Sequence, residues 1–142
     1  MKKTLNYYLM AVLGLILAIA LTGCGTPSLD TIVKRFQKKL PQQTSEDVTI
    51  TKCGVVGDYL EMEMVNDETK VALDSDDFAF VLEIMKVSMK QQFVSEVTVK
   101  RMLRACKDEG KGFRIVLVGE KSGLRVAMLE FTPEELQEDA SI

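Results

Sequence analysis

The fold is decided by residues 47–65, DVTITKCGVVGDYLEMEMV, in which apolar and polar side chains alternate on both sides of a glycine-containing turn. Alternation with a period of two residues is typical of β-strands that bury one face. Gly57 and Asp58 accept the backbone angles of a tight connection. We therefore predict a β-hairpin whose second strand presents Glu61 and Glu63 together on its outer face.

This pair of glutamates allows two interpretations. In the first, Glu61 and Glu63 form the solvated face of a strand. In the second, they work with a nearby lysine as the acid-base groups of a hydrolase or transferase. No nucleophile, phosphate-binding or metal-binding motif accompanies them, so we name no catalytic residue, cofactor site or metal site.

Helices are predicted on both sides of this hairpin. Apolar residues recur at helical spacing from Ser28, a suitable N-cap, to about Leu40. Two more helices follow the hairpin, the first capped by Asp74 or Ser75 and the second capped by Ser95. Each has apolar residues along one face, which predicts that the helices pack on a sheet.

A second hairpin completes the sheet. Its strands are predicted at 113–118 and 124–131, joined by a turn at 119–123 whose glycines permit positive backbone angles. Thr132 then opens a short last helix. The order is helix, two strands, two helices, two strands, short helix. We predict an α+β fold in which a four-stranded antiparallel sheet has the helices on one face.

The N-terminus has the features of an export signal. Lys2 and Lys3 precede an almost uncharged apolar run at 7–21. Leu21-Thr22-Gly23-Cys24 then resembles the lipobox of bacterial lipoproteins, which implies that Cys24 is acylated, for example with palmitate, and becomes the first residue of the mature protein. We therefore predict a signal peptide at 1–23, a lipidated N-terminus and short tether at 24–28, and a single domain at 29–142.

The lipobox resemblance also implies an address in the cell envelope. A lipid on Cys24 would anchor the chain to a membrane. Gly25, rather than aspartate, follows the cysteine, so the retention signal for the inner membrane is missing. In a host with two membranes we expect the outer membrane, on its periplasmic or surface side.

Composition narrows the chemistry of the mature domain. Removal of 1–23 leaves 119 residues, a usual size for one domain, with 16 basic and 21 acidic side chains. This acidic balance argues against nucleic acid as a partner. The chain has no histidine, which excludes Ser-His-Asp and Cys-His catalysis and most zinc chemistry.

Cys53 and Cys106 are the two cysteines left after acylation, and they are candidates for a disulfide. Cys106 shares the apolar face of its helix with Met102 and Leu103. Strict alternation places Cys53 with Thr49 on the side turned away from the helices. A bridge therefore requires the first strand to end or to bulge near Cys53.

The domain as a whole loosely resembles small uncharacterised lipoproteins of Bacteroidetes-type bacteria. The similarity lies in the lipobox, the element order, and Gly119-Glu120-Lys121-Ser122-Gly123 running into Phe131-Thr132-Pro133-Glu134-Glu135-Leu136. It implies an envelope protein without an assigned activity. We expect a non-catalytic domain that binds a protein or peptide, or assists assembly, through its open sheet face or a strand edge. The alternative is the carboxylate-based hydrolase or transferase.

Overall fold

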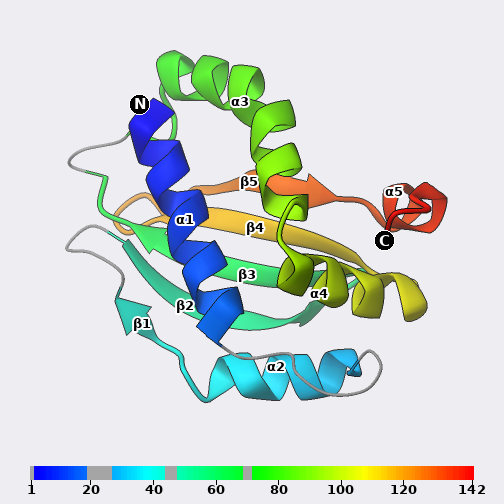
Figure 1. The fold of residues 1–142 in the computed structure, drawn as a ribbon. Helices are drawn as coiled ribbons and strands as arrows, with labels where there is room; N and C mark the ends of the chain where they lie inside the picture. Colours follow the sequence, from blue (N-terminus) through cyan, green and yellow to red (C-terminus); the bar gives the residue numbers. More distant parts are fainter. Residues whose placement is uncertain (1, 19–26, 44–47, 69–71) are drawn as a thin grey trace.

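The computed structural model describes residues 2–18, 27–43, 48–68 and 72–142. It is an α+β structure with five helices and one five-stranded sheet among these residues (Figure 1). The elements in chain order are α1 (Lys2–Ala18), α2 (Leu29–Gln37), β1 (Gln42–Gln43), β2 (Val48–Val56), β3 (Tyr59–Asn66), α3 (Asp76–Val94), α4 (Val97–Asp108), β4 (Gly112–Gly119), β5 (Arg125–Phe131) and α5 (Pro133–Glu138).

The sheet has the strand order β1-β2-β3-β4-β5 and is mixed rather than antiparallel. Both predicted hairpins form, β2 with β3 and β4 with β5. The prediction of four antiparallel strands is wrong, because β3 and β4 run parallel, with Tyr59 opposite Gly112 and Asn66 opposite Gly119. The reason is that α3 and α4 carry the chain back to the end of the sheet where β3 began. The two-residue β1 was not predicted, because it is too short to show a period.

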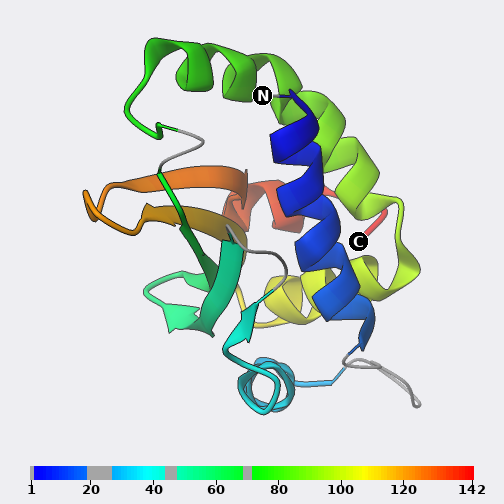
Figure 2. The ribbon, with the colours of Figure 1, turned by 90° about the vertical axis from the view of Figure 1, so that its left-hand side faces the viewer.

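The helices α1, α3 and α4 lie on one face of the sheet, as Figure 2 shows from the side. The helix α2 packs against β2 and α4. Within the described ranges no helix covers the opposite face of the sheet (Figure 2). The sheet therefore has an inner face, which is turned toward the helices, and an outer face.

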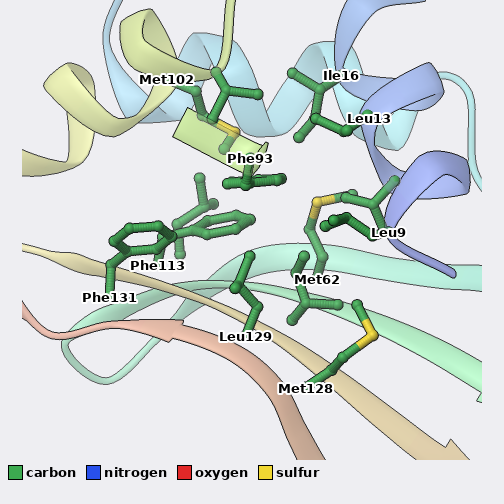
Figure 3. Packing of buried hydrophobic residues seen from close by; sticks show 14 of the residues in the cluster. Leu9, Leu13, Ile16, Met62, Phe93, Met102, Phe113, Met128, Leu129 and Phe131 are labelled. Carbon is green, nitrogen blue, oxygen red and sulfur yellow. The ribbon is translucent and has the colours of Figure 1, made fainter. Parts of the chain in front are cut away.

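Aromatic rings mark the centre of the core. The ring of Phe93, at the end of α3, stacks on Phe113 of β4 with a centroid distance of 5.5 Å and on Phe131 of β5 at 6.1 Å. Figure 3 shows these rings beside aliphatic side chains of the inner face, among them Met62 and Leu129. The last turn of α3 therefore packs on both β4 and β5.

Most predicted helix caps are present. Ser28 and Ser75 accept hydrogen bonds from the backbone N–H groups of Thr31 and Phe78. Thr132 and Glu135 form a reciprocal capping box at α5.

The cap predicted at Ser95 is wrong. Its hydroxyl donates to the carbonyl of Gln92 at 2.6 Å and closes α3, while α4 begins after Glu96 without a side-chain cap. The two helices are so close in sequence that one serine can serve only the end of the first.

Candidate functional site

The predicted carboxylate pair lies on the outer face of β3, but it is not solvated. Only 5% of Glu61 is exposed, and Glu63 is largely covered as well. Arg114 Nε donates to Glu61 Oε2 at 2.7 Å, and Arg125 Nη2 donates to Glu61 Oε1 at 2.5 Å. Arg125 Nη1 donates to Glu63 Oε2 at 2.9 Å. We call these four residues the ion-pair cluster.

The mixed sheet brings the ion-pair cluster together. Glu61 lies directly opposite Arg114 in the parallel β3–β4 register, and Arg125 reaches across from the start of β5. The Arg114 guanidinium also lies 4.4 Å from the centre of the Tyr59 ring. Sequence reasoning missed both arginines. The sequence predicts that both arginines lie on the outer side of the second hairpin. It does not predict the register between the two hairpins, which places them beside Glu61.

In the ion-pair cluster, the carboxylates accept hydrogen bonds from the arginines of the same cluster. Both carboxylate oxygens of Glu61 accept charge-assisted hydrogen bonds. Hydrogen bonds to Glu63 and Glu61 raise the pKa of Arg125 above its usual value. A general base needs a carboxylate oxygen directed at a substrate proton, and in Glu61 both oxygens are already directed at arginines. The cluster therefore fits a structural or recognition role better than acid-base catalysis.

A hollow of about 550 Å³ adjoins the ion-pair cluster. It runs between α2 and the outer face of β2, and its walls include Gln37, Leu40, Thr51 and Lys52. In the described ranges no group of three or more acidic, cysteine or histidine side chains is placed to hold a metal ion.

The two candidate disulfide residues are buried, Cys53 on the inner face of β2 and Cys106 in α4. The strand β2 bulges at Thr51, because Ile50 pairs with Met64 whereas Lys52 pairs with Glu63. The bulge turns Cys53 inward, against the strict alternation. Cys53 and Cys106 are both buried thiols in this structure.

Burial raises the pKa of each of these thiols to about 12. A negative charge on Cys53 would raise the pKa of Cys106 further, after the larger effect of burial. Their oxidation to a disulfide stays a prediction. Cys24 and the rest of the lipobox lie outside the described residues.

The helix α1, predicted to be a signal peptide, packs into the core of the domain. It contacts α3 and α4 and crosses the inner face of the sheet (Figure 1). Figure 3 shows Leu9, Leu13 and Ile16 turned toward the interior that holds Met62 and Phe93. No helix in the described part of the chain is long and apolar enough to span a membrane. The side chains of α1 that are at most 3% exposed are Leu5, Tyr8, Leu9, Val12, Leu13, Leu15 and Ile16.

A buried polar contact joins α1 to the sheet. The hydroxyl of Tyr8 donates a hydrogen bond to Oδ1 of Asn66, at the end of β3. Both side chains are buried. We call the space that α1 fills, between α3, α4 and the inner face of the sheet, the α1 groove.

The outer side of α3 forms a second apolar surface. The apolar face predicted for this helix is turned to the core, since Phe78, Met85 and Met89 are buried. On the opposite side Phe80 is 67% exposed, and Ile84 and Val87 are exposed in the same row. This helix is therefore apolar on two sides.

Comparison with known proteins identifies a shared fold. Neither a protein-family model nor a curated protein sequence matches the chain. The crystal structure of a candidate secreted protein from Pseudomonas aeruginosa matches with a TM-score of 0.56 and 13% identity, over 76% of this chain and 88% of that chain.

Two type II secretion system pilotins match less well. The Vibrio vulnificus pilotin EpsS gives a TM-score of 0.47 at 13% identity, over 77% of this chain and 88% of its own. The Vibrio cholerae pilotin AspS gives 0.44 at 16% identity, over 74% and 85%. At these identities the similarity concerns the fold alone, and the chain shares that fold with the Pseudomonas protein.

Proposed function

We propose that this protein is a lipid-anchored component of the cell envelope whose domain binds another protein and catalyses no reaction. The lipobox-like residues 21–24 support the anchor. The binding role is carried by one observation: α1, which we predict to be removed, fills a groove in the core of the domain and buries seven side chains there.

Removal of α1 would leave a large apolar surface. Full burial of a leucine or isoleucine side chain is worth about 1.5–3 kcal/mol, and the seven α1 side chains make matching contacts in the α1 groove. An apolar surface of this extent is typical of an interaction site in a soluble protein. The mature domain therefore gains stability from any partner that refills the groove.

The enzymatic alternative has less support. A carboxylate-based hydrolase or transferase would use Glu61 and Glu63, but arginines bind both side chains. Within the described ranges, the ion pairs of the cluster are formed by arginines and not by lysine.

The anchor and the binding role are tested together in the native host. Wild-type protein should incorporate a labelled fatty acid and copurify from detergent extracts with one envelope protein at constant stoichiometry. Cys24→Ser should abolish the label. Glu61→Gln combined with Glu63→Gln should leave copurification unchanged. Persistent label in Cys24→Ser, or a hydrolase activity that disappears in the glutamine variant, would contradict the proposal.

A further inference from the structure

We infer that the α1 groove is a site for a single apolar α-helix of a partner protein, and that Asn66 selects a helix with a hydrogen-bond donor at the position of Tyr8. This inference rests on the proposed function and names its partner class. In the precursor α1 is the occupant, and after processing the partner helix takes its place.

The shape of the occupant fits one helix. The helix α1 has 17 residues and so spans about 25 Å. Its buried residues recur along one broad face, while Tyr7, Met10 and Leu17 remain exposed on the other. A groove that already accommodates this cylinder needs no rearrangement to take a second one of similar width.

A helix also satisfies the groove chemically. An extended strand laid across the inner face would bury backbone N–H and C=O groups without partners, because β2, β3 and β4 already pair with one another. A helix forms its backbone hydrogen bonds internally and presents only side chains. A fatty acyl chain would fill the apolar space but could not replace the hydrogen bond that Tyr8 donates to Asn66.

Asn66 gives the groove its selectivity. Its side chain is fully buried and accepts a hydrogen bond from the Tyr8 hydroxyl, beside the apolar side chains of α1. A helix with phenylalanine at this place would keep the ring contacts but lose the hydrogen bond. Loss of one partner of a buried hydrogen bond weakens an interaction more than formation of the bond strengthens it.

The precursor itself provides an intramolecular competitor. While α1 is joined to the domain, its effective concentration at the groove is on the order of millimolar or higher. A separate partner helix must compete with that concentration. Removal of residues 1–23 ends the competition, so processing at Cys24 and opening of the α1 groove would be the same event.

The test uses the full chain with Cys24→Ser, made by cell-free synthesis, with a protease site placed within residues 19–26. We expect the cut segment to stay bound during gel filtration and then to exchange with a fluorescent peptide of residues 2–18 carrying added lysines for solubility. Peptide with Leu9→Asp should not bind. Loss of the cut segment with no uptake of the wild-type peptide would overturn the inference.

The role of Asn66 is tested by a matched pair of peptides. Tyr8→Phe should bind about tenfold more weakly than wild type, whereas Tyr7→Phe, at an exposed position, should bind equally well. In the Asn66→Leu chain, Tyr8→Phe should bind as well as wild type, because the coupled pair is already broken. Equal affinity of both peptides for the wild-type chain would refute the selectivity.

The remaining outcomes separate this inference from the proposed function. If mass spectrometry finds a stoichiometric phospholipid in the emptied groove and the peptide does not displace it, the groove binds lipid and the inference is wrong. If the lipidated protein still copurifies with an envelope protein while the groove rejects every helix, the inference fails and the proposed function survives through another surface, such as the outer face.

Discussion

The two faces of the sheet complete their interactions in different ways. On the outer face, Glu61, Glu63, Arg114 and Arg125 neutralise one another, and all four come from strands of the sheet itself. On the inner face, the apolar side chains need helices from elsewhere in the chain, including α1. The outer face is thus self-sufficient, whereas the inner face depends on an occupant. We therefore expect the binding site on the inner face.

The strongest challenge to this comparison is Phe93→Ala. Phe93 stacks on two strands at the centre of the inner face, so its removal should lower the free energy of unfolding by about 3–5 kcal/mol. The matched control is Phe80→Ala on the exposed side of α3, which should change it by less than about 0.5 kcal/mol. Urea denaturation of the full Cys24→Ser chain measures both. A Phe80→Ala loss as large as that of Phe93→Ala would mean that the core is elsewhere.

A disulfide between Cys53 and Cys106 would link β2 covalently to α4 and so reduce the dependence of the inner face on α1. It would close a loop of about 54 residues and stabilise the fold by about 4 kcal/mol in the chain-entropy model. Protein made in the envelope should therefore lose that stability on reduction. Alkylation of the unreduced, denatured protein reads the state directly, and labelling of both cysteines would show that no bridge forms.

Leu9→Ala tests how much the inner face depends on α1. Leu9 is fully buried, and we expect a loss of about 3 kcal/mol in the unprocessed Cys24→Ser chain, in the middle of the range for leucine truncation. Met10→Ala, on the exposed side of the same helix, is the control and should have little effect. Equal stability of Leu9→Ala and wild type would show that α1 does not support the core.

Glu61→Gln tests whether the outer face is held by its charges. The change keeps the shape of the side chain but leaves two partly exposed guanidinium groups without this carboxylate. We expect a loss of about 1–2 kcal/mol, less than for a fully buried pair because water screens the arginines. Glu83→Gln, whose exposed partner is Lys86, should be neutral. High salt should reduce the difference between the two variants.

Alkaline pH should destabilise the reduced protein through its two buried thiols. Burial raises the pKa of the Cys53 and Cys106 thiols from the ordinary value of 9.0 to about 12. Burial therefore favours the protonated form, so this contribution is complete below pH 9 and is lost as the pH rises toward 12. Unfolding curves between pH 8 and 10.5 should fall more steeply for the wild type than for the Cys53→Ala, Cys106→Ala double variant. Parallel curves would contradict the burial of the thiols.

Local patterns predicted the strands and most caps because the signal for each lies within a few neighbouring residues. Both hairpins and the capping box at Thr132 follow from alternation and turn residues in this way. The parallel contact of β3 with β4 depends on where α3 and α4 return the chain, and no local pattern records that. The pairing of Glu61 with Arg114 depends on the same contact and was missed for the same reason.

Two further features escaped prediction for different physical reasons. The bulge at Thr51 reverses the direction of Cys53 by inserting one residue, which the alternation alone cannot reveal. The packing of α1 was missed because a uniformly apolar segment suits a membrane and a protein core equally well. The same apolar residues suit a membrane and a protein core. Only the presence of the α1 groove shows that they can pack in a core.

The parallel β3–β4 register has a consequence for the order of folding. Each hairpin joins residues that are close in sequence, whereas Tyr59 meets Gly112 only after 52 intervening residues have been brought into place. Contacts of such high sequence separation slow folding, because the entropy of closing the loop is lost before the contact forms. A chain that crosses a membrane from its N-terminus therefore cannot complete its sheet until β4 has emerged. Until then it stays open enough to pass through a translocation channel.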